Sequence, residues 1–114
     1  MKEHIYKLIG EIPSHKNNWK RSRSGGLYMS KREQFDSLLL QLKTQKKTET
    51  LKSIQQVKIY IFGSNRKDAI NEAGCIFDLL EKAEIIKNDR MIKHFWVTKW
   101  IDNNNPHAEV VIHT

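Results

Sequence analysis

Two carboxylates occupy positions where a protein scaffold commonly presents functional side chains. Asp68 follows a run that predicts a strand and precedes a run that predicts a helix, and Asp89 stands just before another predicted strand. Loops at strand ends carry a large share of binding and catalytic residues. Carboxylates that converge there would bind Mg²⁺ or Mn²⁺ through their oxygens. The structural alternatives are a helix N-cap or first-turn acid for Asp68 and an ordinary turn for Asp89.

Basic residues form a second candidate site. The chain has 20 Lys and Arg against 13 Asp and Glu, a net charge of +7, which favours a polyanionic partner. No acid interrupts the cations between residues 16 and 32, and glycine, serine and asparagine separate them, so residues 16–29 predict a mobile basic loop. Phosphate contact, with Trp19 as a stacking residue, is the functional interpretation, and a solvated loop is the alternative. The residues expected to contact phosphates are Lys16, Asn17, Lys20, Arg21, Arg23, Lys31, Arg32, Arg66 and Lys67.

The other reactive side chains give no strong local signature. Five histidines are scattered without metal-ligand spacing, and Cys75 has no nearby cysteine, so we expect Cys75 to be buried on a helix face. A single cysteine excludes an internal disulfide and fits a reducing compartment, so a cytoplasmic location is expected. No run approaches the ~20 apolar residues of a membrane span, and the N-terminal segment lacks a signal-peptide core.

Hydrophobic periodicity predicts the elements that position these residues within one domain, residues 1–114. Ser30 and Glu33 form a capping box before an apolar stripe, which predicts a helix over residues 31–46. The element order is β-α-β-α-β-β, so we expect an α+β fold with helices packed on a mixed sheet. Strands are predicted over 4–12, 54–62, 91–101 and 108–113, with a hairpin turn from Asn103 to Pro106. A second helix is predicted over 66–83, with a core stripe of Ile70, Ala73, Phe77 and Leu80. Polar connections are predicted over 43–50 and 84–90.

Several short motifs along the chain resemble a known family. They are Ile12-Pro13-Ser14, Asn17-Asn18 and Tyr28-Met29-Ser30, then Arg66-Lys67-Asp68, Asn71, Phe77-Asp78-Leu79-Leu80, Ala83 and Asn88-Asp89. The chain resembles the RusA family of Holliday-junction resolvases, which bacterial prophages typically encode. The resemblance implies a homodimeric, Mg²⁺-dependent endonuclease that cuts symmetric strands of a four-way DNA junction during recombination and repair.

The resemblance assigns roles to individual residues. Asp68 matches the first aspartate of the family's D-x-D pair, and Asp89 matches its later aspartate. Ile70 stands where the family has the second aspartate, and Gly74 stands where it has a lysine. Glu72 offers a third metal ligand, because a helical residue four positions after Asp68 would share its face. Asn71 matches the asparagine that follows the D-x-D pair. Lys67 or Lys87 could replace the missing lysine.

Three functions follow as hypotheses. The leading one is a structure-selective endonuclease in which Asp68 and Asp89 are catalytic metal ligands. The alternative is a branched-DNA-binding protein of the same fold that does not cleave, suggested by Ile70 and Gly74. A third, suggested by charge alone, is a basic module for RNA or an acidic protein. The implied homodimer has candidate interface residues in Trp96 and Trp100.

Overall fold

The computed structural model describes residues 2–14 and 25–114, apart from the side chains of 25–31. The α+β class and the β-α-β-α-β-β order agree with the prediction, with one short 3₁₀ helix added. No helix in the described ranges is long and apolar enough to cross a membrane. The elements are β1 (Glu3–Ile9), α1 (Gly25–Gln45), β2 (Gln56–Gly63), α2 (Ala69–Lys82), the 3₁₀ helix η2 (Asp89–Met91), β3 (Phe95–Ile101) and β4 (His107–His113).

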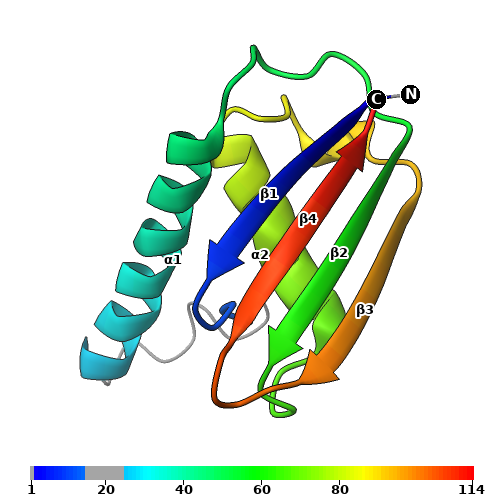
Figure 1. The fold of residues 1–114 in the computed structure, drawn as a ribbon. Helices are drawn as coiled ribbons and strands as arrows, with labels where there is room; N and C mark the ends of the chain where they lie inside the picture. Colours follow the sequence, from blue (N-terminus) through cyan, green and yellow to red (C-terminus); the bar gives the residue numbers. More distant parts are fainter. Residues whose placement is uncertain (1, 15–24) are drawn as a thin grey trace.

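The four strands form one mixed sheet in the order β1-β4-β2-β3. Strand β4 runs antiparallel to both β1 and β2, whereas β3 runs parallel to β2. A parallel pair requires a crossover connection, and α2 supplies it. Both helices lie on the same face of the sheet (Figure 1). The predicted packing of helices on a mixed sheet is therefore confirmed.

Strands β3 and β4 follow one another in the chain but are not neighbours in the sheet. Strand β2 lies between them, so the hairpin predicted at Asn103 to Pro106 is wrong. The turn composition of this segment correctly predicts a reversal of chain direction, but it does not determine which strand pairs with which. Strand β4 is central, as its burial indicates, because four of its consecutive residues from Val110 to His113 are buried.

Helix α1 begins at Gly25, earlier than predicted. Its backbone is helical through Ser30, so Ser30 is not an N-cap and residues 25–29 are not a loop. Glycine is well accepted at a helix start, which allows Gly25 and Gly26 to open the helix. The rest of the predicted basic loop, residues 16–24, lies outside the described residues. The helix ends at Gln45, which leaves a mostly exposed connection to β2.

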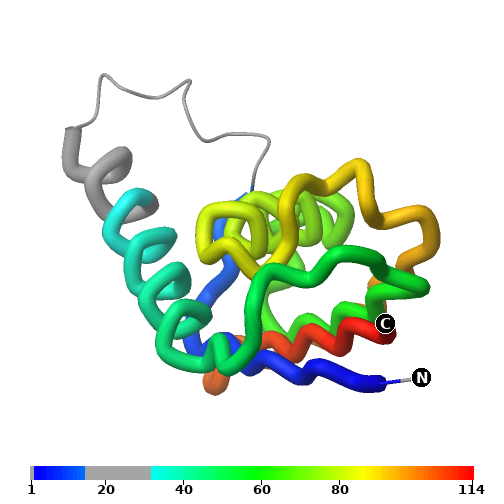
Figure 2. The backbone as a smooth tube through the Cα atoms, turned by 90° about the horizontal axis from the view of Figure 1, so that it is seen from above, coloured from blue at the N-terminus to red at the C-terminus, as the bar shows by residue number. Residues whose placement is uncertain are grey.

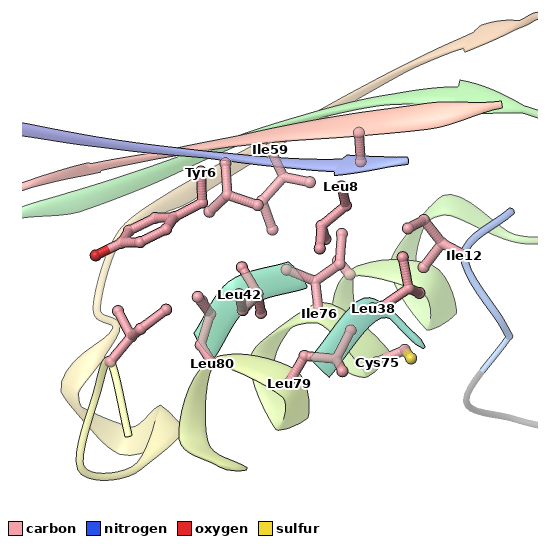
Figure 3. Close-up of a cluster of buried hydrophobic side chains, with 14 of the residues drawn as sticks. Tyr6, Leu8, Ile12, Leu38, Leu42, Ile59, Cys75, Ile76, Leu79 and Leu80 are labelled. Carbon is pink, nitrogen blue, oxygen red and sulfur yellow. The ribbon is translucent and has the colours of Figure 1, made fainter. Parts of the chain in front are cut away.

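The hydrophobic core lies between the sheet and the two helices (Figure 3). Alternate residues of each strand point toward the helices, as the period of two in a strand requires. Cys75 is buried in this core, as predicted. The fully buried large side chains include Leu8, Leu38, Leu42, Ile59, Ile61, Ile76, Leu79, Leu80 and Ile112.

Helix α1 covers the outer edge of β1. Figures 1 and 2 show α1 beside β1, with β3 at the opposite edge of the sheet. The Gln45 side chain accepts a hydrogen bond from Lys7 N at 2.8 Å and donates one to Lys7 O at 2.6 Å. Gln41 makes the equivalent pair of bonds with Ile9. The two amides satisfy edge groups that would otherwise be available to another strand.

Candidate functional site

Asp68 is the N-cap of α2. Its backbone is extended, and its Oδ1 accepts a hydrogen bond from Ile70 N at 2.8 Å. The N-cap interpretation of this residue is therefore confirmed. The residue is exposed at the end of the molecule where β2 finishes. A cap of this kind fixes the carboxylate in position while leaving the residue accessible to solvent.

Asp89 lies beyond the opposite end of α2. Its backbone N donates a hydrogen bond to Oε1 of Glu81 at 2.6 Å, and Glu81 stands in the last turn of that helix. A helix of this length spans about 20 Å, so it separates Asp68 from Asp89 by a comparable distance. One copy of the chain therefore does not bring the two predicted metal ligands together.

Glu72 is buried and does not face Asp68. Its side chain is 1% exposed, and Nζ of Lys99 on β3 lies 2.5 Å from its Oε1. Asp68 precedes the helix, so the helical spacing expected to place both acids on one face does not apply. The predicted role of Glu72 as a third metal ligand does not fit this geometry, because an ammonium group already engages the carboxylate. Across the described ranges, no group of three or more His, Cys, Asp or Glu side chains is placed to hold a metal ion.

A polar network surrounds the Glu72–Lys99 pair. Lys99 Nζ also donates a hydrogen bond to Lys67 O at 2.9 Å. Lys67 Nζ in turn donates to Ile12 O at 3.2 Å and lies 3.8 Å from Oε1 of Glu11. The network therefore connects the end of β1, the β2–α2 loop, α2 and β3 across one end of the sheet. Lys67, expected to contact phosphate, is partly buried within it.

The environment of Glu72 opposes its ionisation in one respect and favours it in another. Burial raises the pKa of the Glu72 carboxyl, and the hydrogen bond and charge of Lys99 act in the opposite direction. Its Oε2 is buried and has no hydrogen-bond partner among the described residues. Lys99 is therefore the group that makes a buried carboxylate tolerable at this position.

Ile70 is exposed, which contradicts its predicted place in the core stripe. Its exposed fraction is 63%, whereas Ala73 and Leu80 of the same predicted stripe are buried. Ile70 lies in the first turn of α2, at the end of the helix where the core stops. An exposed isoleucine therefore stands beside Asp68 at the position where the resemblance implies a carboxylate. Gly74, where the resemblance implies a lysine, follows one turn later.

The described part of the predicted phosphate-contacting set is divided between two elements. Arg32 is exposed on α1, and Arg66 is exposed in the loop before α2. Arg66 N donates a hydrogen bond to Oγ of Ser64 at 3.1 Å, which holds this loop in a turn. The structure does not describe the side chain of Lys31. The other members of the set, together with Trp19, lie outside the described residues: Lys16, Asn17, Lys20, Arg21 and Arg23.

The face of the sheet opposite the helices carries a row of stacked rings that the sequence analysis did not identify. The ring centroid of Phe62 lies 4.3 Å from that of His107 and 4.8 Å from that of Trp100. The period of two along β2, which places Tyr60 and Phe62 on the same face of the sheet, was the available signal for this row. A shallow groove of about 540 Å³ covers the face and is also lined by Lys58 and two glutamates. The faces of the rings are turned toward one another, and the groove carries charges of both signs. A surface that stacks nucleic-acid bases would instead expose ring faces within a positively charged groove.

Strand β3 is the free edge of the described sheet. Val57 N donates to His94 O at 3.0 Å, and in a parallel pair every second residue bonds to the same neighbour. The odd-numbered residues of β3 therefore direct their backbone N–H and C=O groups away from β2. Such an edge is a template for pairing with another chain. The large hydrophobic side chains exposed on β3 are Phe95, Trp96, Trp100 and Ile101.

No family model and no curated protein matches the sequence. The solved structures that share its fold include TubZ of Bacillus thuringiensis serovar israelensis in GDP-form protofilaments, at 14% identity and a TM-score of 0.52. They also include a type III plasmid segregation TubZ, at 12% identity and a TM-score of 0.53. The alignments cover 96% and 97% of this chain but only 25% of each TubZ chain. At this identity the likeness concerns the fold alone.

Proposed function

We propose that the protein is a structure-selective DNA endonuclease resembling the RusA resolvases, with each active site shared between two copies of the chain. Two copies paired antiparallel along β3 would extend the sheet and place the start of one β3 beside the end of the other. Asp89 precedes β3, and Asp68 lies where β3 ends. The pairing would therefore bring Asp89 of a second copy toward Asp68, and the free edge of β3 is the observation that carries this proposal.

A two-fold register that places Thr98 opposite Thr98 would pair the exposed hydrophobic residues of β3 with one another. Phe95 would lie opposite Ile101 of the second copy, and Trp96 opposite Trp100. Cross-strand apolar and aromatic pairs each stabilise an antiparallel sheet by roughly 0.2–1 kcal/mol, and burial of these side chains adds to that. The edge of β1 offers less room for such pairing, because glutamine side chains of α1 bind the outward backbone groups of Lys7 and Ile9.

In this dimer, Asp68 of one copy and Asp89 of the other would hold Mg²⁺ or Mn²⁺. Carboxylate oxygens suit these hard ions, which supply Lewis-acid chemistry for phosphodiester hydrolysis when bound. Glu72 is not included in this ligand set, because Lys99 engages it. Arg32 and Arg66 would contact phosphates of a four-way junction together with the basic residues of 16–31. Binding should then weaken steeply as salt is raised.

The surroundings of Asp68 also favour a second candidate, a branched-DNA-binding protein of the same fold that does not cleave. Ile70 exposes an apolar side chain where the resemblance implies a second aspartate, and Glu72 is not placed to replace it. A site with two carboxylates binds Mg²⁺ less tightly than a site with three. Binding without cleavage would follow if that loss were sufficient.

Mixing two inactive variants tests the shared site. Asp68→Asn and Asp89→Asn should each disable both sites of a homodimer. A heterodimer of the two variants contains one site that has both carboxylates and one that has neither. We expect neither variant alone to cut a synthetic four-way junction with Mg²⁺ or Mn²⁺, and the mixture, after subunit exchange, to nick one strand.

The outcomes separate the hypotheses. Cleavage by the wild type without recovery in the mixture contradicts a shared site. Selective junction binding by the wild type, without cutting under either metal ion, supports the non-cleaving candidate. Equal or tighter binding to duplex DNA or RNA supports the basic module instead.

A further inference from the structure

Lys99 is a largely buried cation that has no role in the sequence-based predictions. Its side chain lies on β3 and is 11% exposed. Nζ makes two contacts, one with Oε1 of Glu72 at 2.5 Å and one with Lys67 O at 2.9 Å. Both partners belong to the short segment that starts α2, so one ammonium group joins β3 to two points of that segment.

The two contacts of Lys99 lie on either side of Asp68. Lys67 O belongs to the peptide group immediately before Asp68, and Glu72 lies in the first turn after it. Within that turn, Glu72 N donates to Asp68 O at 3.0 Å and Ile70 N donates to the Asp68 side chain at 2.8 Å. Lys99 therefore holds the backbone before Asp68 and the side chain that follows it by one helical turn.

The charges around Lys99 explain why both members of the pair are needed. Glu72 stands in the first turn of α2, where the helix dipole favours a negative charge and disfavours a positive one. Lys99 alone would place an ammonium group near that positive helix end. The nearby Lys67 and Glu11 carry one charge of each sign, so they leave the local balance unchanged. Removing either member of the pair leaves its fully or largely buried partner without an opposite charge.

We propose that Lys99 and Glu72 form an ion-pair clamp that positions Asp68, and that Lys99, rather than a metal ion, is the resident cation of Glu72. Lys99 is a positioning residue, because it acts through the segment that carries Asp68. The consequence of the clamp for metal binding by Asp68 rests on the proposed function. The clamp itself does not, since its contacts lie within one copy of the chain.

Amide hydrogen exchange in the metal-free protein tests the clamp. In Lys99→Met, exchange at Ile70 N and Glu72 N should be at least tenfold faster than in the wild type, and the unfolding temperature should fall. In Lys99→Met/Glu72→Leu the unfolding temperature should recover, because no buried charge is left unpaired. Exchange at the two amides should remain fast in this double variant, because nothing holds Lys67 O. Lys58→Met, on the opposite face of the sheet, is the matched control and should change neither quantity.

The double variant also distinguishes positioning from stability. Wild-type exchange rates in that variant, with recovered stability, would overturn the clamp and leave a pair that serves stability alone. If Lys99→Met does not fold, the double variant and Lys99→Arg, which should retain at least part of the protection, still decide the question. The exchange measurement needs neither metal nor DNA, so absence of nuclease activity would count against the proposed function and not against the clamp.

Discussion

The side chain of Gln41 makes the two hydrogen bonds to Ile9 that an adjacent strand would make. Ile9 N donates to its Oε1 at 2.7 Å, and its Nε2 donates to Ile9 O at 3.0 Å. With the equivalent pair from Gln45 to Lys7, these bonds occupy the C-terminal part of the outer edge of β1. Strand β3 is then the more open edge of the described sheet, and this asymmetry underlies the proposed dimer.

Proline substitution at the two edges tests the mode of dimerisation. Ile101→Pro removes an outward N–H of β3 that does not bond to β2, so it should weaken the dimer at least tenfold while preserving the fold. Ile5→Pro is the matched control, because Ile5 is similarly exposed on the edge strand β1 and its N–H also points outward. Analytical ultracentrifugation measures the dimer dissociation constant of both variants. A dimer that survives Ile101→Pro but not Ile5→Pro would contradict pairing along β3.

Restoring a carboxylate at position 70 should strengthen the metal site. Ile70 is exposed and lies in the first turn of α2, so Ile70→Asp removes little packing and places a negative charge where the helix dipole favours it. Mn²⁺ affinity, measured by calorimetry, should rise at least tenfold. Ile70→Asn is the control, because it matches the shape of aspartate without the charge. Equal affinities in the two variants would mean that no metal binds beside Asp68.

The contribution of Glu72 to stability should fall as pH rises. Burial raises the pKa of its carboxyl above the usual 4.5, so the folded state holds this proton more tightly than the unfolded state does. The contribution of the Glu72 carboxyl to folding stability is therefore fully present below pH 4.5, and it is lost as pH rises through the raised pKa. As pH rises above 4.5, the unfolding temperature of the wild type should therefore fall relative to that of Glu72→Gln. A constant difference across that range would contradict the raised pKa.

Cys75 should be unreactive in the native protein. Burial raises the pKa of the Cys75 thiol to about 12, so almost no thiolate is present near neutral pH, and the side chain has no access to solvent. Labelling by a thiol reagent should then proceed at the rate at which the protein opens or unfolds, and adding denaturant should accelerate it. Rapid labelling under native conditions would show that the helix layer opens locally.

Periodicity predicted the elements well where burial alternates regularly. Strand β2 alternates between fully and partly buried residues, and its predicted range of 54–62 differs little from the observed one. Helix α2 likewise shows its core positions through Ala73 and Leu80. Ile70 fits the same period but lies outside the core, because periodicity gives the direction of a side chain and not how far the core extends along the helix.

Contacts between distant segments were not accessible from the sequence. Glu72 and Lys99 are separated by 27 residues, and neither has a local pattern that indicates the other. Helix α2 separates Asp68 from Asp89 in one copy, but the place of β3 at the edge of the sheet, on which the proposed shared site depends, is not indicated by turn composition. The Gly25-Gly26 pair shows the same limit, because a glycine pair suits both a loop and a helix start.

The mixture of Asp68→Asn with Asp89→Asn tests the shared-site endonuclease most directly. The measurement is nicking of a four-way junction in the presence of Mg²⁺ or Mn²⁺, with each variant alone and the wild type in parallel. A shared site predicts cutting by the wild type, none by either variant, and recovery of one-strand nicking in the mixture. A mixture as inactive as its components, beside a wild type that cuts, would contradict it.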